Sequence, residues 1–238
     1  MGSKKQSRED ITYFRMYDDK DMYRARVTIK SFLNHTVKKI KNKINSKQLT
    51  MFEKGCFGYF LKVQELQFSG QTVNEMLWRQ CVGEDMDVME FNFGGSGARF
   101  TIQEFGLITG LCCGPIPTTR AATSHHFRDK YFSSRKLPLH NSDIDDIFDR
   151  VTCEDDDDML RLALLLFLET VVLGKEKPTP VPLEHIDMLD DLEYFTSYPW
   201  STISYRSTLQ SMRGCPARRR NKSHTYTITG FPLAFMVS

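Results

Sequence analysis

The segment from Ala98 to Leu111 constrains the fold of this chain more than any other segment. Thr101 and Glu104 have the spacing of a capping box, in which the hydroxyl and the carboxylate accept hydrogen bonds from the first backbone N–H groups of a helix. Apolar residues then recur every three or four positions. Gly110 or Gly114 supplies the positive φ that favours a helix end, and two prolines follow. The segment therefore predicts a short, sharply bounded helix.

The residues before this helix predict a β-hairpin. From Asp87 to Phe93 apolar and polar side chains alternate, which is typical of a strand with one buried face. Gly94–Gly97 is rich in turn-forming residues, and Ala98–Phe100 can pair back as a second strand. Because the run lacks the Gly-Lys-Ser/Thr ending of a phosphate-binding loop, we interpret it as a hairpin turn.

Most of the remaining chain has helical periodicity. The fold predicted is therefore mainly α with a small β-hairpin or sheet (α+β), in one compact helical domain over 23–238 after a partly ordered polar lead-in over 1–22. The apolar segment 230–237 is expected to dock into the core or to continue into something missing. The predicted helices cover 24–45, 46–54, 72–80 after a Thr72 cap, 142–148 after a Ser142 cap, 159–173, about 186–195 and about 200–212, and a further strand covers 226–229.

The apolar run Met159–Leu173 is too short for a membrane span, which needs about 20 apolar residues. It also contains Arg161 and Glu169. The acidic run Glu154–Asp158 just before it favours a helix start, because carboxylates interact well with the positive end of the helix dipole. We therefore expect a buried core helix, no membrane association and no metal site in the acidic run.

The six cysteines favour reduced thiols in an intracellular protein. No pair has C-x-x-C spacing, and no secretory signal is present. Adjacent Cys112 and Cys113, and a pair at His125 and His126, do not converge as zinc ligands usually must. No metal and no cofactor are predicted. The cysteines are Cys56, Cys81, Cys112, Cys113, Cys153 and Cys215.

A catalytic site is not favoured by the sequence. Cys113 with His125, His126 or His140 would be the one thiol–imidazole pair to consider. The surroundings of Cys113 do not match those of a cysteine protease nucleophile. We therefore predict that the chain is not an enzyme and assign no catalytic residue.

A basic run near the end of the chain is the main candidate contact site for nucleic acid or an import receptor. It consists of Arg218, Arg219, Arg220 and Lys222. The alternative is a solvated loop between a helix and a strand. The lysine-rich face of the helix predicted over 24–45 can join the basic run, but such a face on an amphipathic helix is normally only solvated. The net charge of +2 is too small to imply a polyanionic partner from bulk charge.

Seven segments, taken in order, resemble a plant family known as domain of unknown function 1985. The central block also resembles the plant mobile domain. The segments are Phe57–Leu61, Ala98–Phe105, Thr109–Leu111, Leu164–Glu169, Leu173–Lys175, Ser197–Trp200 and Gly230–Ala234.

This resemblance implies a role without known catalytic residues. Members occur in plant genomes, many in transposon-derived genes, and some precede a SUMO-specific cysteine protease domain. They usually continue past Gly230–Pro232, so the resemblance implies a truncated domain. We expect a non-enzymatic interaction module with a protein partner, located inside the cell and more in the nucleus than in the cytoplasm. The alternative is a fragment of a SUMO protease gene that lacks the catalytic domain.

Overall fold

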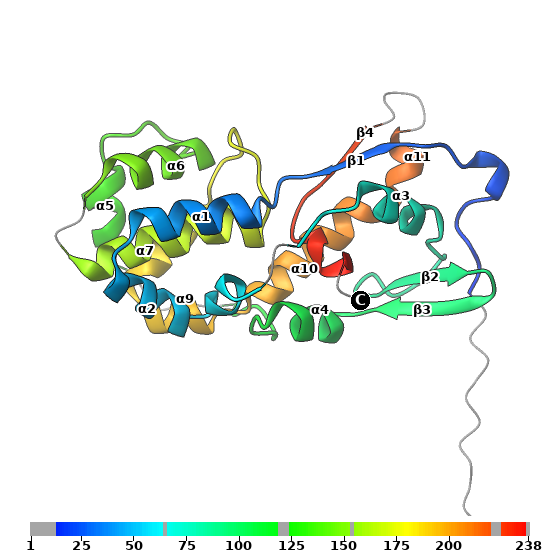
Figure 1. The fold of residues 1–238 in the computed structure, drawn as a ribbon, viewed down its shortest axis with the longest axis horizontal. Helices are drawn as coiled ribbons and strands as arrows, with labels where there is room; N and C mark the ends of the chain where they lie inside the picture. Colours follow the sequence, from blue (N-terminus) through cyan, green and yellow to red (C-terminus); the bar gives the residue numbers. More distant parts are fainter. Residues whose placement is uncertain (1–12, 64–65, 119–123, 153–154, 220–224, 237–238) are drawn as a thin grey trace, which may run out of the picture.

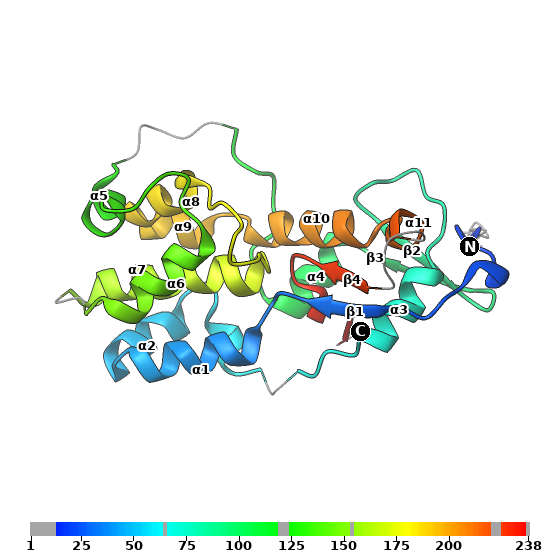
Figure 2. The ribbon, with the colours of Figure 1, turned by 90° about the horizontal axis from the view of Figure 1, so that it is seen from above.

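The computed structural model describes residues 13–63, 66–118, 124–152, 155–219 and 225–236. The fold is mainly α with a small β content, as predicted, and the strands form two separate two-stranded sheets. One end of the elongated molecule contains α1, α2 and α5–α9, and the other contains both sheets with α3, α4 and α11 (Figure 1). α10 runs from the helical end toward the sheets, which the view from above also shows (Figure 2).

The helices and strands have the following bounds. The α-helices are α1 (Leu33–Lys43), α2 (Ser46–Lys54), α3 (Gly70–Trp78), α4 (Ile102–Thr109), α5 (His126–Phe132), α6 (Asn141–Arg150), α7 (Asp156–Phe167), α8 (Leu183–Asp187), α9 (Leu192–Ser197), α10 (Trp200–Met212) and α11 (Cys215–Arg219). The strands are β1 (Arg26–Ile29), β2 (Met89–Phe93), β3 (Ser96–Phe100) and β4 (Thr225–Ile228).

The predicted hairpin and capped helix are confirmed, but the turn is shorter than the predicted Gly94–Gly97, because β3 already begins at Ser96. β2 and β3 are antiparallel, with Met89 opposite Phe100. The hydroxyl of Thr101 accepts a hydrogen bond from the backbone N–H of Gln103 at 3.2 Å, and the Glu104 carboxylate accepts one from the backbone N–H of Thr101 at 2.8 Å. Gly110 ends α4 with a φ of +68°, so Gly110 rather than Gly114 takes the left-handed conformation.

The helix predicted over Arg24–Asn45 is wrong in its first third. Residues 26–29 form β1, and α1 starts only at Leu33. β1 pairs in parallel with β4, with Val27 opposite Tyr226. The spacing between Ile29 and the apolar residues of α1 matches helical periodicity only by coincidence. The residues of β1 form a strand because they pair with β4, which comes near the other end of the chain.

Three other helix starts differ from prediction for local reasons. Ser69, not Thr72, caps α3, since its hydroxyl accepts from the Thr72 backbone N–H at 3.2 Å. α6 begins at Asn141, directly after His140, and not after Ser142. The helix expected from Met159 begins earlier as α7, capped by Asp155, and its last part is a π-helix, η3 (Leu168–Val172).

The apolar end of the chain packs into the core, which is one of the two outcomes predicted for it. The ring centroid of Phe235 lies 4.2 Å from that of Phe100, and the ring centroid of Phe231 lies 5.3 Å from that of Phe60. These residues belong to one continuous apolar cluster that reaches both ends of the molecule. Among the described residues, no helix has the length and apolar character to cross a bilayer.

The lead-in boundary at residue 22 stays a prediction, and residues 1–12 lie outside the described part. Within residues 13–22, the backbone N–H of Met16 donates to the carbonyl of Gln80 at 2.7 Å. The short helix η1 (Asp19–Asp21) follows. This part of the lead-in therefore contacts the folded body.

Candidate functional site

The predicted basic run is described only in part. Arg218 and Arg219 lie in the last turn of α11, not in a loop as the alternative interpretation had it. Pro216 is compatible with this helix because it occupies the first turn, where no intrahelical N–H is needed. Arg220 and Lys222 lie outside the described residues. The hypothesis of a nucleic-acid or import contact thus stays a prediction.

The cysteines and histidines weighed in the sequence have separate surroundings. The Cys113 thiol lies 3.2 Å from the hydroxyl of Ser201, whereas His125 pairs with Asp187 at 3.1 Å between Nδ1 and Oδ2. Among the described residues, no contact joins Cys113 to an imidazole, and no group of three or more His, Cys, Asp or Glu side chains could hold a metal ion. Cys153 lies outside this description, and the other five cysteines have free thiols.

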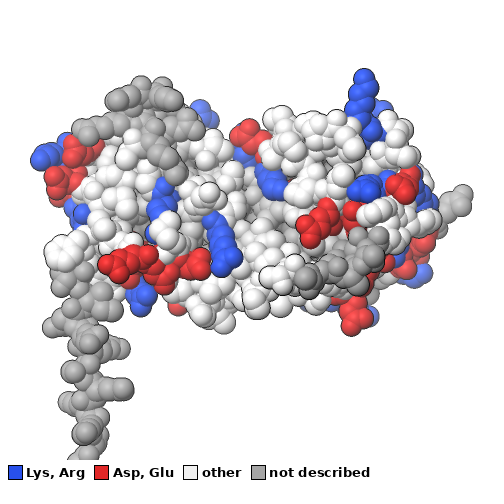
Figure 3. Space-filling model, turned by 180° about the vertical axis from the view of Figure 1, so that it is seen from behind, with Lys and Arg blue, Asp and Glu red and all other residues white. Residues whose placement is uncertain are grey.

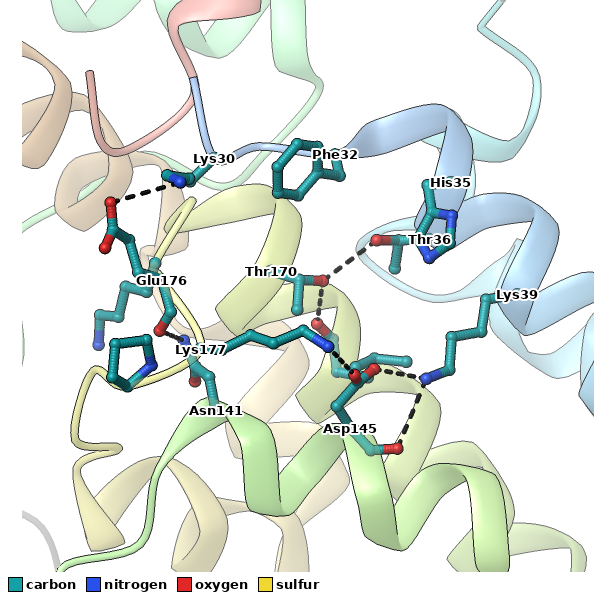
Figure 4. A pocket seen from close by; sticks show the side chains of 13 residues that line it. Lys30, Phe32, His35, Thr36, Lys39, Asn141, Asp145, Thr170, Glu176 and Lys177 are labelled. Carbon is teal, nitrogen blue, oxygen red and sulfur yellow. Dashed lines mark hydrogen bonds and ion pairs between the residues drawn. The ribbon is translucent and has the colours of Figure 1, made fainter. Parts of the chain in front are cut away.

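A groove of about 610 Å³ lies between α1, α6, the end of α7 and the connector that follows η3 (Figure 4). We call this the α1–α6 groove. Its volume falls within the usual range of ligand-binding sites, about 300–1,000 Å³. The lining residues are Lys30, Phe32, His35, Thr36, Lys39, Asn141, Asp145, Leu166, Thr170, Lys175, Glu176, Lys177 and Pro178.

Ion pairs order the charged wall of the groove. Asp145 lies between Lys39 and Lys177, and its Oδ2 is 2.9 Å from the Lys177 Nζ (Figure 4). Lys39 also contacts Asp149 at 2.8 Å. Burial by itself would raise the pKa of Asp145, but hydrogen bonds and charge from the two lysines outweigh it and lower that pKa. On the opposite side, Lys30 lies 3.6 Å from Glu176.

The apolar part of the groove contains one exposed aromatic ring. Phe32, the residue before α1, has 54% of its surface exposed. Leu166 is buried beneath the groove, and the hydroxyls of Thr36 and Thr170 lie 3.3 Å apart. The ring of Phe32 is thus available to a molecule that enters the groove.

Asn141 contributes a buried hydrogen-bond acceptor to the groove wall. Only 2% of the residue is exposed. Its Nδ2 donates to the carbonyl of Glu176 at 3.2 Å. Because only the nitrogen of the amide can donate to a carbonyl, this contact distinguishes the amide nitrogen from the amide oxygen. Its Oδ1 is buried and has no hydrogen-bond partner among the described residues. Such atoms are uncommon in folded proteins.

A second charged cluster adjoins the groove through Lys175 and is centred on a carboxylate that is closed to solvent. Glu169, on the π-helical segment, is fully buried; its Oε1 lies 2.5 Å from Nδ1 of His185, and its Oε2 lies 3.2 Å from Nζ of Lys175. The His185 ring packs edge-on against Trp200. Burial alone would raise the pKa of Glu169, but His185 and Lys175 hold it below its ordinary value.

The Glu169–His185 pair lies outside the lining of the α1–α6 groove. A carboxylate that orients an imidazole is also found at catalytic sites. Here, however, Glu169 and His185 are not among the residues that line the groove. Lys175 is the single member that belongs to both the cluster and the groove wall.

Sequence analysis missed the α1–α6 groove because its residues come from distant segments. The only local signal was the run of lysines on the 24–45 segment, which was interpreted as a solvated face. Glu169 stood out only as a charge inside an apolar run. The spacing of residues gives no indication of its partner His185.

The surface seen from behind is of mixed charge. Basic and acidic side chains are interspersed on this face, with a broad uncharged area between them (Figure 3). Among the residues that the structure describes, this face therefore presents no continuous basic track of the kind that binds a nucleic-acid backbone.

The comparisons with known proteins give one family. A family model described as a domain of unknown function (DUF1985) matches residues 77–211, more than half of the chain. No curated protein and no solved structure matches the chain. The matched segment contributes Asn141, Asp145 and the connector to the groove, whereas α1 lies outside it.

Proposed function

The chain belongs to the DUF1985 family, and from this premise we propose that it is a non-enzymatic interaction module. The α1–α6 groove is the proposed binding site for a segment of a partner protein. One observation carries the proposal: an aromatic residue that is 54% exposed, Phe32, lies in a groove of about 610 Å³ whose charged groups already pair with one another.

The side chains that could do chemistry support a non-enzymatic role. The thiol of Cys113 contacts a serine hydroxyl and backbone carbonyls. Glu169 and His185 are sealed beneath the groove. A nucleophile needs a base within hydrogen-bond reach and access to substrate. Neither group of residues has both.

A peptide-display library selected on the full chain tests the proposal. Selected peptides should bind the wild type and lose about tenfold or more in affinity for Phe32→Ala, because the exposed ring is the expected anchor. Leu107→Ala is the matched control, since Leu107 is 84% exposed but lies on α4, outside the groove. Peptides that bind Phe32→Ala as tightly as the wild type would overturn the proposal.

The alternative, a fragment of a SUMO protease gene, predicts an inactive chain when tested alone. Cleavage of a SUMO precursor by this chain, abolished by Cys113→Ala, would contradict the non-enzymatic proposal.

The plant and transposon origin and the nuclear location are implied by the family resemblance and stay predictions. Duplex and single-stranded DNA titrations at two salt concentrations, with Arg218, Arg219 and Arg220 replaced by alanine, test the basic run.

A further inference from the structure

We infer that the α1–α6 groove binds an extended peptide that places an apolar side chain against Phe32 and donates a backbone N–H to Asn141. The inference rests on the proposed function and names the chemistry of the partner segment. It depends on three features of the groove: an unfilled acceptor, paired charges and an exposed ring.

The unfilled acceptor points to a donor supplied from outside the chain. The amide of Asn141 is held by its Nδ2, which leaves Oδ1 buried and without a donor among the described residues. A buried acceptor without a partner is unfavourable. The terminal amide torsion has a broad minimum, so Oδ1 can turn a small way toward the groove. A peptide N–H is a neutral donor suited to this position.

The paired charges favour an uncharged segment over a polyanion. Each of the four lysines in the lining has a carboxylate within ion-pair distance. A phosphate group would have to compete with these carboxylates for every lysine. An uncharged peptide would leave the pairs intact and bury the methylene stems of the lysines. The pairs are Lys30–Glu176, Lys39–Asp145, Lys175–Glu169 and Lys177–Asp145.

The exposed ring favours an apolar side chain in the segment. Phe32 is more than half exposed at the start of α1, where no side chain caps the helix. Aromatic and aliphatic anchors in such hollows supply much of the affinity of peptide complexes. The ring and the amide come from opposite walls of the groove (Figure 4), so an extended peptide suits it better than one isolated side chain.

The test uses the full ¹⁵N-labelled chain and a defined probe. The probe is N-acetyl-Gly-Phe-Gly amide, together with three depsipeptides that each replace one residue's N–H by an ester oxygen. The parent peptide should shift the amide resonances of Phe32, Leu166 and Thr170. One depsipeptide should bind about tenfold more weakly, because it cannot donate to Asn141, and the other two should bind like the parent.

Two variants assign the effect to the named residues. Phe32→Ala should weaken all four probes about tenfold. In Asn141→Ala the difference in affinity between the parent peptide and the weakly binding depsipeptide should vanish. If this variant does not fold, the affinities of the depsipeptide series for the wild type decide the question.

Each contrary result has a distinct meaning. Groove shifts with equal affinity for all four probes would overturn the inference and leave the proposed function standing. Groove shifts caused by a single-stranded DNA oligonucleotide and not by the peptide would overturn the peptide class. If neither this peptide nor any library-selected peptide shifts groove residues, the proposed function itself is wrong.

Discussion

Two carboxylates in this protein each pair with two basic side chains, but their surroundings are very different. Asp145 lies between Lys39 and Lys177 on the groove wall, and Glu169 lies between His185 and Lys175 beneath it. Both pKa values are lowered by hydrogen bonds and charge from their basic neighbours, against the effect of burial. The side chain of Asp145 is 25% exposed, whereas that of Glu169 is fully buried.

This difference means that the ion pairs of the groove wall can rearrange around a ligand, whereas the buried cluster around Glu169 cannot. Water screens the pairs of the groove wall, so they contribute little to stability and can rearrange around a ligand. Breaking the buried cluster would leave uncompensated charge in a medium of low polarity. We therefore expect Glu169 to hold the groove's lower wall in place and Asp145 to shape its surface.

The largest expected effect comes from removing the buried carboxylate. Glu169→Ala should lower the free energy of unfolding by about 3–5 kcal/mol, because Lys175 and His185 lose their partner and a cavity remains. Urea denaturation followed by circular dichroism measures it. Glu169→Gln keeps the shape and should lose less. A loss below about 1 kcal/mol in Glu169→Ala would mean that the buried cluster contributes no more to stability than a surface ion pair does.

Acidification should reduce the contribution of Glu169. Its folded pKa lies below the ordinary 4.5, so the unfolded chain takes up a proton at higher pH than the folded chain. The stability difference between wild type and Glu169→Gln should be complete above about pH 5 and shrink as the pH falls through the folded pKa. Denaturation at a series of pH values measures it. A difference that grows on acidification would contradict the lowered pKa.

A smaller effect is expected at the groove wall. Asp145→Ala should lower the free energy of unfolding by about 1 kcal/mol, since Lys39 and Lys177 can turn toward water. Asp149→Ala is the matched control, because Asp149 pairs with Lys39 and its side chain is 59% exposed. A loss as large as that of Glu169→Ala would erase the contrast between the two carboxylates.

The smallest expected effect is that of salt. A double-mutant cycle for Lys177 and Asp145 should give a coupling energy that falls as NaCl rises from about 0.05 M to about 0.5 M. The same cycle for Lys175 and Glu169 should give a coupling energy that changes less, because Glu169 is fully buried and only Lys175 is partly exposed to the solution. Equal salt dependence in the two cycles would show that both pairs are solvated.

Elements coded by neighbouring residues could be predicted from the sequence. The hairpin up to Phe100, the Thr101–Glu104 capping box and the end of α4 at Gly110 depend on contacts within a few positions. Docking was one of the two outcomes predicted for the apolar end of the chain, from its composition alone, and Phe235 packs on Phe100.

Features that depend on distant segments could not be predicted. β1 was assigned to a helix because its partner β4 comes near the end of the chain. The run of aspartates before Met159 was explained by the helix dipole alone, yet Asp158 also binds Lys130 and Arg161. The α1–α6 groove combines Phe32 with Asn141, which no spacing rule connects.

The position of a bound peptide is the most direct test of the central claim. A structure of the chain with a library-selected peptide, by crystallography or NMR, should place the peptide between α1 and α6 with a side chain on the ring of Phe32. A peptide seated on another face, such as α11 or the thiol of Cys113, would contradict the assignment of the groove as the binding site.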